Sequence, residues 1–122
     1  LLGVHEVHHG DCMGADAQAD AIAVSLGVRR VAHPPTATGL RAFCACEEIR
    51  VPAPFLTRNH GIVQAVEILV ACPSGRERLR SGTWSTVRYA RRLGVPRVII
   101  TPRGIVVDDE DGGRAPLTRE GC

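Results

Sequence analysis

The residue types best suited to binding an anion gather where the apolar run EILVAC, residues 67–72, gives way to a helical pattern. The loop between them, PSGRERLRSGT, is far longer than a plain turn needs. Gly75 and Gly82 would let the backbone turn tightly and approach a ligand closely. Thr83 begins a helix whose free N–H groups and dipole favour an anion. The loop therefore predicts a phosphate-binding site.

Hydroxyl groups and one fixed positive charge surround the start of this helix. They are the side chains of Arg80, Ser81, Thr83, Ser85 and Thr86. Pro73 opens the loop directly after the apolar run. The alternative interpretation is that Ser81 or Thr83 only caps the helix, which accounts for one hydroxyl but not for two glycines or the length of the loop.

A second glycine-rich turn, GDCMGAD, follows another strand-like run. Gly10 and Gly14 would allow a ligand to approach closely. Asp11 and Asp16 could accept hydrogen bonds from ribose hydroxyls or base amines, although either aspartate could instead be a helix N-cap. The turn matches neither the GxGxxG fingerprint nor a Walker A loop, so it does not indicate a generic dinucleotide or NTPase site.

Three further side chains have informative positions. Arg58 opens the helical pattern that leads to the run at 67–72, and we interpret it as a clamp for an anion, with an ordinary surface arginine as the alternative. His33 ends a strand-like run directly before two prolines and has either a ligand or a structural role. Trp84 has the spacing of a core residue.

Strands and helices alternate along the chain. Strand-like runs lie at 4–9, 28–33, 67–72 and 96–101, with a last edge strand at 105–107, and helical patterns lie at 15–26, 56–66 and 84–93. The first helix presents an apolar face made by Ala15, Ala19, Ile22, Ala23 and Leu26. Residues 36–55 are predicted to be irregular, either a lid or a poorly ordered surface segment. The alternation predicts an α/β fold, a three-layer Rossmann-like domain with a mostly parallel sheet.

All of the polar loops follow predicted strands. Because the carboxyl ends of parallel strands share one edge of a sheet, we expect these loops to form a single ligand site. We expect the domain to span residues 1–108, with an acidic, Gly-rich tail at 109–122. The chain starts without Met and runs straight into a strand, which suggests a fragment that lacks its natural beginning.

Composition excludes several classes of function. A net charge of +2 and 3% aromatic residues do not favour a nucleic-acid surface, which would need stronger charge and stacking platforms. No apolar run is long enough to span a membrane. Five cysteines without regular spacing or a secretory segment suggest reduced thiols in the cytoplasm. A zinc site built from Cys44 and Cys46 with nearby histidines is conceivable, but the pair is not CxxC, so we predict neither a metal nor a cofactor.

Four segments together resemble the SLOG superfamily of Rossmann-like nucleotide-binding domains, in particular its YspA/YpsA-like branch. They are HHGDCMGADAQADAIA, HPP, RNHGIVQAVEILVACPSG and RSGTWSTVRYARRLGVPRVIITPRG, and the resemblance spans residues 5–104. The superfamily includes the Lonely Guy phosphoribohydrolases and the DNA processing protein A family. Its members usually begin with an additional strand and helix, which the resemblance implies are missing here.

The resemblance also implies roles for single residues. Gly10 and Gly14 match the first glycine-rich loop of the Lonely Guy type, and Arg58 matches its clamp arginine. Pro73, Gly82 and Thr83 match the proline and the final Gly-Thr of the PGGxGTxxE motif, although the loop between them is longer here. The glutamate of that motif, which is linked to cleavage of the bond between base and ribose, falls on Thr86.

We therefore expect a domain that binds a nucleotide or a nucleotide-derived small molecule, with a sensor role as one form of this function. The alternative is a nucleoside 5′-monophosphate phosphoribohydrolase, with Asp11 or Asp16 supplying the missing carboxylate. Single-stranded DNA binding is a third and weaker hypothesis. We expect no membrane partner, and a homo-oligomer is left open.

Overall fold

The computed structural model describes residues 3–108, so the predicted tail at 109–122 lies outside the described residues. The chain divides into two compact units, Leu1–Ile62 and Val63–Cys122, and we describe each by itself. Within the described residues, no helix combines the length and the apolar character that crossing a membrane would require.

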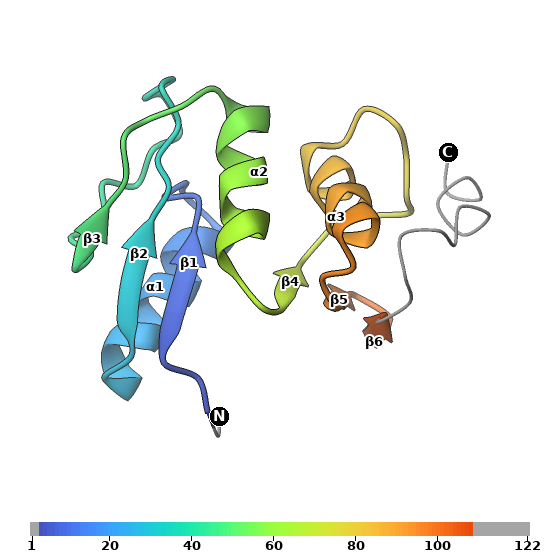
Figure 1. The fold of residues 1–122 in the computed structure, drawn as a ribbon, viewed down its shortest axis with the longest axis horizontal. Helices are drawn as coiled ribbons and strands as arrows, with labels where there is room; N and C mark the ends of the chain where they lie inside the picture. The colour runs from blue at the N-terminus through green and yellow to red at the C-terminus, as the bar shows by residue number, and fades with distance from the viewer. Residues whose placement is uncertain (1–2, 109–122) are drawn as a thin grey trace. The chain divides into compact units, whose positions relative to one another are not determined.

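The first unit is built on three parallel strands (Figure 1). Their order in the sheet is β1 (Glu6–His9), β2 (Arg29–Ala32) and β3 (Glu48–Ile49), and all neighbours pair in parallel. The helix α1 (Ala15–Leu26) connects β1 to β2, and α2 (Phe55–Ala65) follows β3. Val31 and Ala32 on β2 are completely buried, as expected of a central parallel strand.

The apolar face predicted for α1 is wrong in part. Ala23 is buried as expected, but Ile22 and Leu26 are 59% and 54% exposed, and the other buried residue of the helix is Asp20. Asp20 is buried because His9 and Arg30 both donate to its carboxylate. The side of α1 that faces the first unit is therefore marked by the hydrogen-bonded Asp20 as well as by Ala23, and the apolar spacing alone does not identify it.

Residues 36–55 are largely irregular, as predicted, but they are tied to the rest of the first unit. They contain β3, and isolated bridges join Cys12 to Arg41 and Pro35 to Ala53. Single backbone hydrogen bonds, such as the one from Met13 N to Leu40 O at 2.8 Å, hold the segment at intervals. The segment thus lies against the turn that follows β1.

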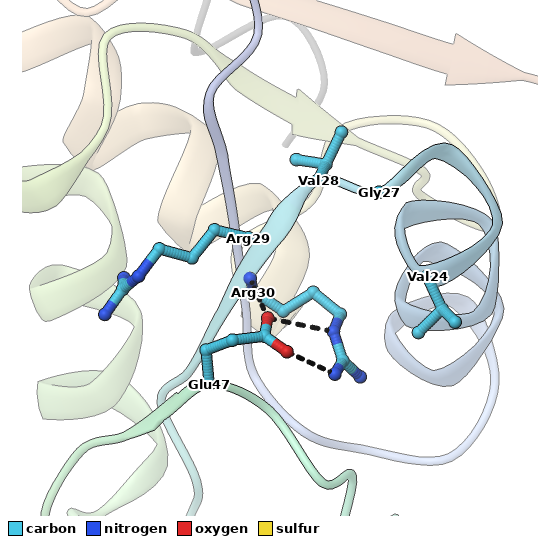
Figure 2. A pocket seen from close by; sticks show the side chains of 6 residues that line it. All are labelled: Val24, Gly27, Val28, Arg29, Arg30 and Glu47. Atoms are coloured by element: carbon cyan, nitrogen blue, oxygen red, sulfur yellow. Dashed lines mark hydrogen bonds and ion pairs between the residues drawn. The ribbon is translucent and has the colours of Figure 1, made fainter.

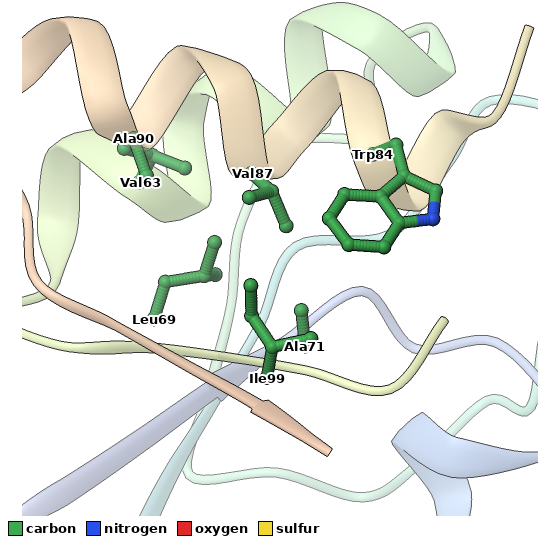
Figure 3. Close-up of a cluster of buried hydrophobic side chains, with 7 residues drawn as sticks. All are labelled: Val63, Leu69, Ala71, Trp84, Val87, Ala90 and Ile99. Carbon is green, nitrogen blue, oxygen red and sulfur yellow. The ribbon is translucent and has the colours of Figure 1, made fainter. Parts of the chain in front are cut away.

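The second unit contains β4 (Leu69–Ala71), α3 (Gly82–Leu93), β5 (Arg97–Thr101) and β6 (Gly104–Asp108). β4 pairs in parallel with β5, and β5 pairs antiparallel with β6 through a tight turn. One face of this sheet packs against α3 in a cluster of seven buried side chains (Figure 3): Val63, Leu69, Ala71, Trp84, Val87, Ala90 and Ile99. The core position predicted for Trp84 is confirmed.

Helix α3 has well-defined ends. Ser81 is its N-cap, and the side-chain oxygen of Ser81 accepts a hydrogen bond from Trp84 N at 3.1 Å. Gly94 ends the helix in the left-handed conformation, with φ 73°, and its N–H satisfies the carbonyls of the last turn. The capping role considered for Ser81 is therefore confirmed.

The α/β class is confirmed, and so are the positions of the predicted helices and strands. The described strands form two three-stranded sheets rather than one, and the short strand β3 was not predicted. A three-layer, Rossmann-like domain with a single, mostly parallel sheet stays a prediction.

Candidate functional site

Arg58 lies where two neighbouring parallel strands end. Its Nη1 donates to the carbonyl oxygen of Gly10, directly after β1, and to that of His33, directly after β2, the latter at 3.2 Å. Its Nε donates to Asn59 Oδ1 at 2.7 Å. The residue is only 9% exposed. The carboxyl ends of parallel strands are where open α/β sheets bind ligands, so this guanidinium occupies the predicted position.

The charge of Arg58 is not neutralised by an ion pair. Its partners are carbonyl and amide oxygens, and within residues 3–108 no carboxylate forms a salt bridge with it. Its Nη2 donates only to Cys12 Sγ, at 4.0 Å, in that part of the chain, and its Cζ lies 5.5 Å from the centroid of the Phe55 ring. A buried cation with an unfilled donor is suited to an anionic ligand.

Gly10 is a glycine because Arg58 comes close to it. A Cβ atom at this position would overlap Nη1 of Arg58 and lie 2.7 Å from its Cζ. The same Cβ would lie 2.9 Å from Asp16 Oδ2, so the clamp arginine and a carboxylate flank one backbone position. Gly10 therefore serves the approach of a protein side chain, whereas the sequence suggested the approach of a ligand.

Asp11 is completely buried and fully engaged. Its Oδ1 accepts from Cys44 N and its Oδ2 from Arg41 Nε, both at 2.8 Å. Burial raises the pKa of this carboxyl, but the hydrogen bonds from Cys44 and Arg41 outweigh burial and hold the pKa below its usual value. In this structure its carboxylate organises the loop at 41–44, so contact with a ligand would require those bonds to break.

Asp16 and Gly14 are at the start of α1. Gly14 is the N-cap, with φ 96°, a conformation that favours glycine, and no side chain caps this helix. Neither Asp11 nor Asp16 is therefore the N-cap, which corrects that alternative. Asp16 Oδ2 accepts from Cys12 N at 3.2 Å, and Asp16 is only partly buried. Of the two candidate carboxylates, Asp16 is the accessible one.

The other predicted site residues lie in the second unit, around the loop before α3. Pro73 is buried, Ser81 and Thr86 are partly buried, and Arg80, Gly82 and Thr83 are exposed. Ser81 is occupied as the helix cap, and the Thr86 hydroxyl donates to Gly82 O at 2.9 Å. Ser81, Gly82, Thr83 and Thr86 lie at the amino end of α3, whereas Pro73 follows β4.

Neither of the two loop glycines has a backbone conformation that only glycine adopts readily. Neither Gly75 nor Gly82 has a positive φ, and a Cβ at Gly82 would meet nothing within 4 Å among the described residues. The loop is shaped instead by hydrogen bonds to α3. Trp84 Nε1 donates to Gly75 O at 3.0 Å, and Arg88 donates to the carboxylate of Glu77 at 3.2 Å.

A polar cluster in the first unit offers groups that bind metals. The ligand atoms of His9, Asp20 and Cys44 lie within 4.8 Å of one another, and Cys46 Sγ lies 3.6 Å from His9 Nε2. However, Asp11 N donates to Nδ1 of His9 at 3.0 Å, so the ring proton is on Nε2 and is donated to Asp20 Oδ1 at 2.9 Å. A metal would need the lone pair of Nε2.

The thiols of this cluster do not favour a metal either. Burial raises the pKa of Cys44 and of Cys46 to about 12, and neighbouring aspartates add to the shift in each case. Both are free, as are Cys12 and Cys72. We interpret the cluster as a structural network that joins α1 to the segment at 44–46.

His33 is buried and linked to a second histidine. Its Nε2 lies 2.8 Å from Nδ1 of His8, whose Nε2 lies 3.0 Å from Glu6 Oε1. Burial, and then the charges of His8, Arg50 and Arg58, lower the pKa of His33 to about 4, against a weaker opposing effect of Glu48. The structure gives His33 a structural contact through its ring and places its carbonyl oxygen on Arg58.

Acid is expected to destabilise the protein through His33. Because the pKa of His33 is about 4 in the folded state and 6.5 when unperturbed, the unfolded state binds more protons between these values. Stability is thus full above pH 6.5 and falls as pH is lowered toward 4, by at most about 3 kcal/mol. Urea unfolding across this window should show a slope that His33→Gln reduces and that His5→Gln, at an exposed histidine, keeps.

The first unit has a hollow of about 430 Å³ (Figure 2), and Arg58 is not one of its lining residues. It is lined by Val24, Gly27, Val28, Arg29, Arg30 and Glu47. Arg30 is paired with Glu47 and Asp20, and Arg29 with Glu6 and Glu48. Because these arginines are already neutralised and lie at the start of β2, we do not assign a ligand to this hollow.

Sequence reasoning missed three residues that the structure makes prominent. Glu77 is buried between Arg88 and Arg91, Arg41 holds Asp11, and Phe43 is an exposed aromatic with φ 56°. Only Glu77 could have been noticed in the sequence, since it is an acidic residue among loop arginines.

Comparison of the chain with protein-family models, with curated proteins and with solved structures found no match.

Proposed function

We propose that this protein binds a nucleotide or a nucleotide-derived small molecule through its phosphate. The observation that carries the proposal is Arg58, a buried guanidinium at the carboxyl ends of β1 and β2 that forms no ion pair within the described residues. A phosphate oxygen on Nη2 would supply the missing countercharge and form a charge-assisted hydrogen bond.

The buried position of Arg58 makes such a ligand favourable. A cation taken out of water is stable only when hydrogen bonds or an opposite charge replace its hydration. Gly10 O and His33 O replace part of it but carry no net charge. An arriving phosphate would therefore gain more from this arginine than from one on the open surface, where salt screens the attraction.

The second unit carries its own proposal for phosphate binding. Arg80, Ser81, Gly82 and Thr83 at the amino end of α3 are proposed to bind phosphate oxygens, in the way the SLOG resemblance implies. We also propose the Rossmann-like arrangement and a sensor role on that resemblance. The open space around Gly82 supports the idea that a ligand could approach its backbone.

Hydrolysis is the second candidate, and Asp16 is the observation that favours it. Its carboxylate flanks Gly10 together with Arg58 and is partly exposed, and among residues 3–108 only Cys12 N donates a hydrogen bond to it. Cleavage of a base from ribose develops positive charge on the sugar, which a carboxylate stabilises. Asp11 is too tightly held for this role, and Thr86 has no charge at neutral pH.

The proposal is tested by titrating the purified protein with nucleoside 5′-monophosphates in a calorimeter. Wild type should bind at least one, and Arg58→Ala should weaken binding roughly 10- to 100-fold, the range for a hydrogen bond to a charged group. Arg103→Ala is the matched control, because it removes the same charge from an exposed position.

Two outcomes would contradict the proposal. Equal losses in Arg58→Ala and Arg103→Ala would mean that only net charge matters, and absence of binding to every monophosphate would refute a nucleotide site. Chromatography of the same mixtures decides between binding and hydrolysis. We expect no free base, whereas sustained release that Asp16→Asn abolishes would establish the hydrolase.

A further inference from the structure

An exposed aromatic ring stands on the loop next to the turn that Arg58 holds. Phe43 is 61% exposed and has φ 56°, a backbone conformation that bulky side chains rarely adopt. A strained conformation persists only where the surrounding structure holds it, and here the side chain is mostly exposed. Packing within the described residues therefore does not explain why an aromatic side chain occupies this position.

The backbone on both sides of Phe43 is tied to one residue. Ala42 N donates to Asp11 O, and Cys44 N donates to Asp11 Oδ1, each at 2.8 Å. Asp11 is itself fully buried. The ring is therefore displayed from a fixed support, and holding it in place costs little further entropy when something packs on it.

One side of the ring is already stacked. The guanidinium carbon of Arg41 lies 4.4 Å from the ring centroid, and Arg41 Nε donates to Asp11 Oδ2 at 2.8 Å. The rest of the ring is open, and Met13 and Leu40, which are also more than half exposed, are joined next to Asp11 by a hydrogen bond of 2.8 Å. A flat apolar group would therefore find an open aromatic face here.

We propose that Phe43 is the stacking platform for the base of the nucleotide, an inference that rests on the proposed function. The phosphate clamp and the ring are attached to consecutive residues of one turn. Arg58 holds Gly10 and contacts Cys12, and the Phe43 loop is held by Asp11 between them. A ligand with an anion at one end and an aromatic base at the other satisfies both features, whereas a sugar phosphate satisfies only the first.

The test compares two probes, AMP and ribose 5-phosphate, which differ by the base. Wild type should bind AMP more tightly than ribose 5-phosphate. Phe43→Ala should weaken AMP roughly 5- to 100-fold, the range for stacking of one base on an aromatic side chain, and leave ribose 5-phosphate unchanged. Phe43→Trp should keep the affinity for AMP, and Val51→Ala, at another exposed apolar side chain, should change neither.

Phe43→Gly separates stacking from a structural role. Glycine tolerates the positive φ, so this variant should melt no lower than wild type while losing affinity for AMP. A lower melting temperature with unchanged affinity would make Phe43 structural and overturn the inference.

The inference and the proposed function fail in different ways. If both probes bind equally, or both lose affinity in Phe43→Ala, the platform is wrong while the Arg58 clamp stands. If neither probe binds wild type, both are refuted. If Phe43→Ala changes only the oligomeric state in ultracentrifugation, the ring is a contact between copies, and the platform is again wrong.

Discussion

Gly10→Ala is expected to abolish most of the affinity for phosphate ligands while leaving the protein folded. The added Cβ would overlap Nη1 of Arg58, which is the far end of a flexible side chain and can move away. In moving, Arg58 gives up its hydrogen bonds to Gly10 O and His33 O. We expect affinity for nucleoside monophosphates to fall at least tenfold and the free energy of unfolding to fall by about 2 kcal/mol.

Gly61→Ala is the matched control, since it adds the same methyl group in the same unit. A Cβ at Gly61, within α2, would lie 3.7 Å from His33 Nδ1, an ordinary van der Waals contact. Alanine favours a helix over glycine by roughly 1 kcal/mol, so this variant should be at least as stable as wild type and bind normally. Unchanged affinity in Gly10→Ala would show that Arg58 is not the clamp.

The importance of Gly10 could be predicted from the sequence, but its reason could not. Two glycines in a turn after a strand indicate a backbone that something approaches closely. The sequence does not show that the approaching group is Arg58, which lies 48 residues further along the chain, in α2. Prediction from local pattern identified the position, and only the folded chain identified its partner.

The same limit explains the aspartates. Asp11 and Asp16 looked equivalent in the turn GDCMGAD, yet Asp11 is buried by bonds to Arg41 and Cys44, residues that the sequence assigned to an irregular segment. The segment could not be predicted because its structure depends on single bridges and a two-residue strand rather than on periodicity. Phe43 was missed for the same reason.

Elements whose stability comes from a repeating apolar pattern were predicted well. Trp84, Val87 and Ala90 recur at helical spacing on α3 and are buried as expected, whereas Leu93, the fourth residue of that predicted face, is 49% exposed. On α1 the pattern was misleading, because the burial of Asp20 by His9 and Arg30 depends on partners outside the helix. Polar networks of this kind carry no periodic signal.

Glu77→Gln is expected to cause the largest loss of stability in the second unit. Glu77 is 7% exposed, and its carboxylate accepts hydrogen bonds from Arg88 and from Arg91, all at 3.2 Å. Arg91 Nε in turn donates a hydrogen bond to Asp108 Oδ2 at 3.1 Å, so the network joins the loop to α3 and β6. Removing the central negative charge leaves Arg91 paired with Asp108 and Arg88 with no carboxylate partner among residues 3–108. Breaking a buried ion pair in this way typically costs about 3–5 kcal/mol.

That loss would be a large share of the stability of a small protein, which is usually about 5–15 kcal/mol. Urea unfolding followed by the fluorescence of Trp84, the one tryptophan in the sequence, measures it, because Trp84 Nε1 contacts the same loop. Glu67→Gln is the control, since Glu67 is exposed and should lose less than about 0.5 kcal/mol. In Glu77→Gln with Arg88→Gln the losses should be less than additive, because the second change removes an unpaired charge. Strict additivity, or a loss below about 1 kcal/mol in Glu77→Gln, would mean that water screens these charges and that other contacts hold the loop before α3.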